Sequence, residues 1–169
     1  MEKFNSEQLS IVNNAITVAE ELVSDSYKLS ASQWLRHRYE VKTEIDLNEN
    51  EKVEIPFAQL IRYKGQKKRS SLGSCSFDYY KICLMDSNIL SAFKESEQLK
   101  LFPFLLYIVS HELIHIVRFS AFLQSFSASF EEKIKEEVRV HNKTHEILSK
   151  AKIQNMTPVL NYKGWEIEK

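Results

Sequence analysis

The sequence predicts an α+β fold, in which a small, mostly antiparallel sheet of about three strands packs on helices. Three observations support this class. Apolar residues recur every three or four positions near both ends of the chain, as they do in amphipathic helices. Between these segments, residues 41–85 contain stretches of alternating apolar and polar side chains, as half-buried strands do. A nearly continuous apolar run at 101–117 then indicates a buried central helix.

Length and charge restrict the possible functions. A chain of 169 residues can bury a core of its own, and we expect residues 1–169 to form a single domain. Lysine plus arginine equals aspartate plus glutamate at 23 each, so no net field draws the chain to nucleic acid or anionic lipid. The most apolar run, Leu101–Val109, is too short to span a bilayer. We therefore expect neither a membrane nor a nucleic acid as partner.

The cysteines and the N-terminal residues favour a cytoplasmic location. The first residues lack the charged and then apolar pattern of a signal peptide. Cys75 and Cys83 stand eight apart in one predicted strand, which at the strand rise is too far for a disulfide. We expect both thiols to be reduced core groups.

The first half of the chain predicts one helix and three strands. A helix begins with Ser6 as its N-cap and runs to about Ser26, and Trp34–Arg38 continues as a short helical piece or turn. The strands cover residues 41–47, 53–61 and 76–85, with a turn at 48–51. Pro56 places the second strand at an edge or a bulge. The basic segment Lys64–Ser71 is expected to be a solvated loop at a hairpin tip.

The second half predicts helices and a packed tail. Asp86 and Ser87 cap a short helix that ends near residue 98. Pro103 fits the first turn of the central helix, which runs to about Phe122. A last long helix covers 131–152, with Ile134, Val138, Ile147 and Leu148 on its core face, and the aromatic tail 156–165 packs on the body.

The central helix contains the motif His111-Glu112-Leu113-Ile114-His115. Residues four apart share one face of a helix, so His111 and His115 can point two imidazoles at one metal ion. Glu112 lies about a quarter-turn away, where it reaches a water on the metal rather than the metal itself. One helical turn thus supplies two zinc ligands and a general base.

A third ligand is expected from the last helix. Glu137, His141 and His145 follow one another at intervals of four and form one stripe, with Glu136 on a neighbouring stripe. A catalytic zinc ion needs three protein ligands and one open position. The sequence predicts one Zn²⁺ held by His111, His115 and a residue of this stripe, and it leaves Glu137 and His141 as the leading alternatives.

The motif helix resembles the active-site helix of the zincin metallopeptidases, and the spacing is closest to the glutamate-zincin branch. In that branch a glutamate on a later helix is the third ligand, and Glu137, 22 residues beyond His115, matches that position better than Glu136. An acidic residue often follows one turn after the glutamate, where this chain has His141. The resemblance implies a minimal zincin-like domain with a buried active-site helix and a C-terminal ligand-bearing helix.

The resemblance also implies a function. It predicts a zinc metallopeptidase in which Glu112 is the general base and a peptide or protein is the substrate. Zincins place a strand beside the bound peptide, and Phe77–Leu84 occupies that place in chain order. The second group that stabilises the oxyanion is left open among His141, His145, Tyr79, Tyr80 and Arg118.

Two other metal sites fit part of the pattern. If His111, His115, Glu137 and His141 all coordinate, the site is closed, and the protein is a metal-stabilised binding or regulatory protein without catalysis. The Glu112-x-x-His115 spacing also occurs in di-iron helical bundles, but the predicted strands and the absence of a second such pair argue against that fold.

Overall fold

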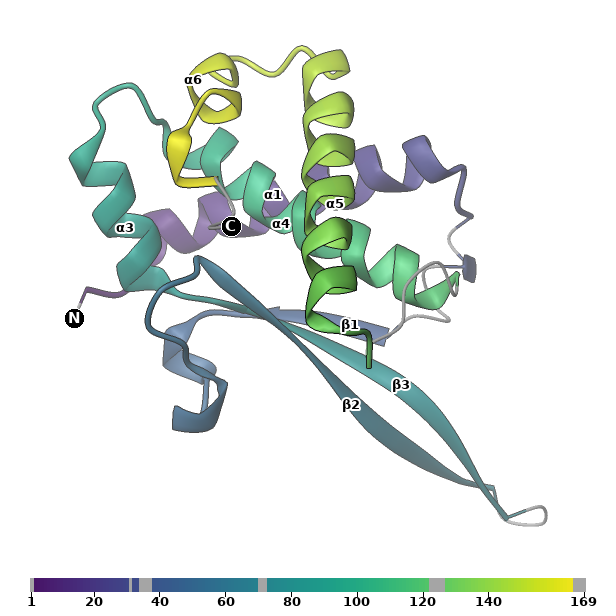
Figure 1. Cartoon of the computed structure of the whole chain (residues 1–169). Coiled ribbons are helices and arrows are strands. Elements are labelled where there is room, and N and C mark those ends of the chain that lie inside the picture. Colours follow the sequence, from purple (N-terminus) through teal and green to yellow (C-terminus); the bar gives the residue numbers. More distant parts are fainter. Residues whose placement is uncertain (1, 31, 34–37, 70–72, 122–126, 166–169) are drawn as a thin grey trace.

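The structure is a computed structural model that describes residues 2–30, 32–33, 38–69, 73–121 and 127–165. At residues 38, 65–69 and 73–77 it describes the backbone alone. The α+β class is confirmed, because this part of the chain holds five α-helices and one three-stranded sheet (Figure 1). In order, the elements are α1 (Ser6–Tyr27), β1 (Arg38–Lys42), the 3₁₀ turns η1 (Glu44–Asp46) and η2 (Glu49–Glu51), β2 (Ala58–Arg69), β3 (Gly73–Leu84), α3 (Asp86–Glu95), α4 (Leu101–Ser120), α5 (Phe130–Lys150), α6 (Thr157–Leu160) and η3 (Lys163–Trp165).

The sheet is mixed, and most of its paired positions are antiparallel, as expected. Its strand order is β1-β3-β2, with β1 parallel and β2 antiparallel to β3. Because β3 is central, it pairs with β1 over 79–83 and with β2 along its whole length. The segment Phe77–Leu84, expected to lie beside a substrate, therefore has a neighbour on both sides over 79–83, and β2 is an edge strand of the described sheet. Cys83 on β3 is buried and free, as expected, whereas the side chain of Cys75 lies outside the described ones.

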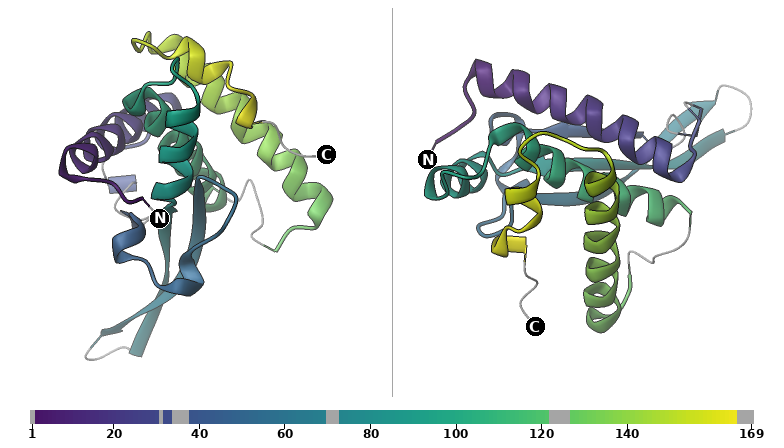
Figure 2. Two further views of the ribbon diagram at one scale, coloured as in Figure 1. Left: turned by 90° about the vertical axis from the view of Figure 1, so that its left-hand side faces the viewer. Right: turned by 90° about the horizontal axis from the view of Figure 1, so that it is seen from above.

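The predicted strands 41–47, 53–61 and 76–85 correspond to β1, β2 and β3, and each has other bounds than predicted. The predicted strand 41–47 ends at Lys42, because the carboxylate of Asp86 accepts the N–H of Glu44 at 3.0 Å and the chain turns into η1 there. The predicted loop 64–71 is strand as far as Arg69, since backbone pairing with β3 continues whatever the polarity of the side chains. The long β2–β3 hairpin extends beyond the helices in all three ribbon views (Figures 1 and 2).

Helix α1 packs on α4 through small residues. Its buried face is Val12, Ala15, Ala19 and Val23, spaced by three and four positions. The N-cap is Asn5 rather than Ser6: the Asn5 side chain accepts from the Gln8 N–H at 2.8 Å, and Gln8 accepts in return from the Asn5 N–H at 2.9 Å. Of the predicted helical piece at Trp34–Arg38, residues 34–37 lie outside the described ones and Arg38 begins β1.

Helix α4 is the core of the molecule. Almost every side chain between Leu101 and Val117 is buried, and α1 and α5 pack against it on one side of the sheet (Figure 2). By length and composition α4 is also apolar enough to cross a membrane, although the run Leu101–Val109 alone is not. The most apolar 18-residue window of α4 is 78% buried inside the fold, which is the environment of a core helix.

Helix α5 buries Ile147 and Leu148, as predicted, but not the other two residues predicted for its core face. Val138 is 45% exposed and Ile134 only partly buried, while the buried residues are Glu136, Val140, Thr144, Ile147 and Leu148. The buried face therefore includes two polar residues, which a count of apolar positions does not detect. The helix begins after a capping box, in which the Ser129 hydroxyl accepts from the Glu132 N–H at 3.3 Å.

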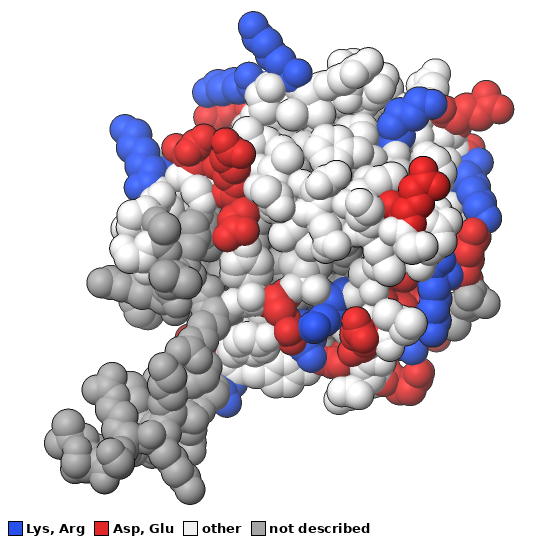
Figure 3. All heavy atoms as spheres, turned by 180° about the vertical axis from the view of Figure 1, so that it is seen from behind, with Lys and Arg blue, Asp and Glu red and all other residues white. Residues whose placement is uncertain are grey.

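The tail packs on the body, as expected. Trp165 donates its indole N–H to the carbonyl of Val159 at 2.7 Å, and its ring contacts those of Phe104 and Phe57. On the face opposite the view of Figure 1, acidic and basic side chains are interspersed around a broad area of uncharged residues (Figure 3). The described residues of that face therefore present no continuous field of one sign.

Candidate metal site

One stripe of α4 faces the N-terminal half of α5. Tyr107, His111 and His115 are spaced by four residues, so their side chains leave the same face of the helix. The apolar residues on the other faces of α4 are buried in the core, and this packing fixes the rotation of the helix about its axis. The direction of both imidazoles is thus set by the burial of their neighbours.

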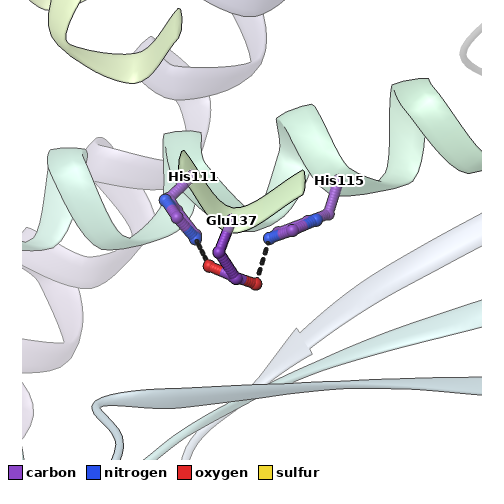
Figure 4. Close-up of side chains that lie close together, drawn as sticks. All are labelled: His111, His115 and Glu137. Carbon is purple, nitrogen blue, oxygen red and sulfur yellow. Dashed lines mark hydrogen bonds and ion pairs between the residues drawn. The ribbon is translucent and has the colours of Figure 1, made fainter. Parts of the chain in front are cut away.

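Glu137 of α5 lies between the two histidines. Its Oε2 is 3.1 Å from His111 Nε2 and its Oε1 is 2.9 Å from His115 Nε2 (Figure 4). One ligand atom from each of these residues lies within 4.8 Å of the other two. Of the residues that the structure describes, these three form the group able to hold a metal ion.

The geometry and the donor set fit zinc. Two imidazole nitrogens and one carboxylate oxygen are common protein ligands of a catalytic zinc ion. With bonds of about 2.1 Å to a tetrahedral ion, two ligand atoms lie roughly 3.4 Å apart. One ligand atom from each of the three residues lies within 4.8 Å of the other two, so the longest of these separations has to shorten by at most about 1.4 Å when an ion binds.

The charge state of Glu137 suits a ligand. Burial favours the neutral carboxyl, but the hydrogen bonds and the charge of His111 and His115 outweigh burial and hold the pKa of Glu137 well below its usual range. The side chain is therefore a carboxylate at neutral pH, which is the form that binds a cation.

Glu112 is part-buried beside the three candidate ligands. Burial raises the pKa of its carboxyl, and the nearby Glu137 acts in the same direction, while His111 and His115 oppose them. A general base works best when its pKa lies near the working pH. The raised pKa moves Glu112 toward that condition.

His111, Glu112 and Glu137 line one pocket of about 310 Å³. The other walls come from the segment that enters β2, from α4, from α5 and from the tail, and they are largely apolar or aromatic: Pro56, Phe57, Ala58, Tyr107, Ile108, His141, Gly164 and Trp165. The candidate site therefore combines converging polar groups with an apolar wall, the usual composition of a small-molecule or peptide-binding pocket.

His141 lines the pocket but is held by another partner. Its Nδ1 is 2.5 Å from the hydroxyl of Tyr107, and His141 is not part of the group formed by His111, His115 and Glu137. Burial lowers the pKa of His141 to about 4, and the neighbouring His145 and His111 act in the same direction. His141 is therefore a neutral imidazole at pH 7.

The remaining candidate residues lie elsewhere or have other partners. Glu136 is buried and its Oε2 accepts from Arg118 Nη2 at 3.2 Å, so neither side chain is directed at the pocket. His145 packs its ring 4.4 Å from that of His141, and its Nε2 is buried without a hydrogen-bond partner among the described residues. Tyr79 and Tyr80 lie on the central strand and do not line the pocket.

Most of the pocket walls were not predicted from the sequence, and Tyr107 and Trp165 are two examples. Tyr107 stands one turn before His111, and this position on the motif stripe was a usable signal. Trp165 stacks on Tyr107, with ring centroids 4.2 Å apart and planes at 17°. Nothing local to the tail indicates this contact, because it depends on the path of residues 151–165 back across α4.

Comparison with protein-family models, with curated proteins and with solved structures finds no match to this chain. The likeness to the zincins rests on the residues of α4 and α5 described above.

Proposed function

We propose that this protein is a zinc-dependent hydrolase that cleaves peptide bonds. The observation that carries the proposal is the convergence of His111, His115 and Glu137 within 4.8 Å beside Glu112. Three ligands from two helices, one adjacent carboxylate and a pocket are the parts that metal-assisted hydrolysis requires.

Each residue has a distinct role in the proposal. His111 and His115 bind the ion through Nε2, and Glu137 binds it through its carboxylate. The bound ion supplies a water of lowered pKa and polarises the carbonyl. Glu112 accepts the proton of the attacking water and delivers it to the leaving nitrogen, so it begins and ends the reaction as a carboxylate.

The walls of the pocket support a peptide as substrate. Phe57, Ile108 and Trp165 offer an apolar surface next to the candidate ligands, which favours a substrate with a large apolar side chain near the cleaved bond. Among the described strands β2 pairs on one side only, and its first residue, Ala58, lines the pocket. An extended peptide can therefore add along β2 as a further strand through main-chain hydrogen bonds.

Metal analysis and two variants test this proposal. We expect the purified protein to bind one zinc ion per chain and to cleave members of a degenerate peptide library. His111→Ala should abolish both properties. Glu112→Gln should keep the zinc and lower kcat by roughly 100-fold or more, because it keeps the shape of the base and removes its proton affinity.

The results of these experiments distinguish the metal site, the general base and the peptidase activity from one another. A wild-type chain without stoichiometric metal would refute the metal site. Full activity of Glu112→Gln would refute the role of the base while leaving the metal site. Stoichiometric zinc without cleavage of any peptide would instead favour a metal-stabilised binding protein.

A further inference from the structure

The hydroxyl of Tyr107 is buried and has one hydrogen-bond partner among the described residues. The residue is 1% exposed, and a phenol keeps its proton near neutral pH. A buried hydroxyl that donates to nothing costs free energy comparable to a lost hydrogen bond. In the described part of the chain, the acceptor within reach of the Tyr107 hydroxyl is His141 Nδ1, at 2.5 Å.

This bond fixes the state of the His141 ring. If the phenol donates, Nδ1 must be the nitrogen with a free lone pair, because a protonated nitrogen accepts nothing. The ring proton is then on Nε2. The rings of Tyr107 and His145, at 5.8 and 4.4 Å between centroids, pack against His141 and restrict its rotation.

The position of His141 allows its Nε2–H group to act as a hydrogen-bond donor in the pocket. His141 lines the same pocket as His111, Glu112 and Glu137, and it follows Glu137 by one turn of α5. Amide hydrolysis builds negative charge on the carbonyl oxygen, and a preorganised N–H donor stabilises that charge. The other donors considered for this role do not line the pocket; they are His145, Arg118, Tyr79 and Tyr80.

We propose that Tyr107 is a positioning residue that holds His141 as an Nε2–H donor, and that this donor binds the carbonyl oxygen of the substrate as charge develops on it. The inference rests on the proposed hydrolytic function. It assigns His141 to the substrate and leaves metal binding to the other three residues.

NMR spectroscopy measures the tautomer of His141 without an activity assay. In ¹⁵N-labelled, metal-free protein near pH 7, we expect long-range ¹H–¹⁵N spectra to show His141 with a protonated Nε2 and a hydrogen-bonded Nδ1. His141→Gln removes these signals and so assigns them. In Tyr107→Phe, the Nδ1 resonance should move to the position of an unbonded nitrogen. A protonated Nδ1 in the wild-type chain would overturn the proposal.

Kinetics with zinc-loaded protein and a cleaved library peptide test the donor. We expect His141→Phe to lower kcat by about 100- to 1,000-fold, the usual effect of losing one oxyanion donor. His141→Gln, which retains an N–H group, should lose less, and Tyr107→Phe should lose roughly tenfold by releasing the ring. Zinc content and KM should stay close to those of the wild type in all three variants.

Tyr27→Phe is the matched control for Tyr107→Phe, because Tyr27 ends α1 and does not line the pocket. We expect its kcat to be unchanged. Wild-type kcat in His141→Phe would overturn the donor role, and loss of zinc from that variant would make His141 a ligand instead. A wild-type chain that binds zinc and cleaves no peptide would overturn the proposed function and the donor role together, while the spectra would still report on the pairing of Tyr107 with His141.

Discussion

Two adjacent glutamates of α5 have different partners. Glu137 points to His111 and His115, whereas Glu136 is 3% exposed and paired with Arg118. Successive residues on a helix leave it about 100° apart, so only one of the two can face α4 at the motif. The choice between Glu136 and Glu137 is thus made by the rotation of α5, which its buried face sets.

The Arg118–Glu136 pair is a structural contact that can be tested. Burial raises the pKa of Glu136, but the guanidinium of Arg118 outweighs burial and lowers it overall. Arg118→Ala leaves a buried carboxylate without its main partner, and we expect it to reduce the free energy of unfolding by about 2–4 kcal/mol. Urea denaturation at pH 7 measures this change.

Arg139→Ala provides the control for that measurement. Arg139 contacts the same carboxylate at 3.2 Å, but its side chain is 63% exposed, so its loss should cost less than about 1 kcal/mol. The double variant Arg118→Met/Glu136→Leu should recover most of the stability, because it leaves no unpaired buried charge. Equal losses in Arg118→Ala and Arg139→Ala would contradict the structural role.

At the residue scale, the sequence predicts what depends on local spacing. The partnership of His111 and His115 follows from four-residue periodicity, which holds in any helix. The third ligand could not be chosen in the same way, because Glu137 and His141 lie on one stripe and both can face α4. In the structure, His141 Nδ1 is hydrogen-bonded to the hydroxyl of Tyr107 on α4. The spacing of residues within α5 does not reveal this bond.

At the scale of elements, the prediction failed where polar groups are buried. Thr144 belongs to the core face of α5 because its hydroxyl donates to the Val140 carbonyl at 2.7 Å, and Glu136 belongs there because of Arg118. A pattern of apolar residues alone points instead to Ile134 and Val138. The parallel pairing of β1 with β3 was missed for a similar reason, since alternation marks a strand but not the direction of its neighbour.

Glu51 attaches η2 to the sheet and so supports the segment that leads to the pocket wall at Pro56. Its Oε2 accepts from Lys81 Nζ at 2.7 Å and from the Tyr63 hydroxyl at 2.8 Å, and its Oε1 accepts from the Asn48 N–H at 2.9 Å. Lys81, Asn48 and Tyr63 lower the pKa of this buried carboxylate to about 2.

Stability should therefore depend on pH through Glu51. The folded pKa lies below the unfolded value of about 4.3, so the carboxylate stabilises the fold fully above about pH 5 and loses that contribution as the pH falls toward 2. Glu51→Gln should lower the free energy of unfolding by about 1–3 kcal/mol at pH 7 and flatten its decline in acid.

Urea denaturation at pH 7, 5 and 3 measures this dependence. Glu49→Gln is the matched control, because Glu49 belongs to the same 3₁₀ turn and its side chain is 92% exposed. We expect Glu49→Gln to follow the wild-type profile. A Glu51→Gln profile with the wild-type slope in acid would show that another carboxylate is responsible.

On the scale of the whole molecule, the candidate ligands join the two helices that pack around the site. His111 and His115 come from α4, Glu137 comes from α5, and residues 121–129 connect these helices in the chain. An ion bound by all three side chains is a cross-link that the unfolded chain cannot form with the same affinity. Metal binding should therefore appear as added stability of the whole fold.

Zinc should raise the melting temperature of the chelator-treated protein. With free zinc at about 1,000 times its dissociation constant, mass action adds roughly 4 kcal/mol, which for a chain of this size is a shift of roughly 8–16 °C. Glu137→Ala removes one of three ligands and should abolish most of the shift at the same zinc concentration, whereas His141→Gln should keep it. Differential scanning calorimetry of the three proteins, with and without zinc, makes the comparison. The reverse result, a shift kept in Glu137→Ala and lost in His141→Gln, would transfer the third ligand to His141 and remove it from the substrate side of the pocket.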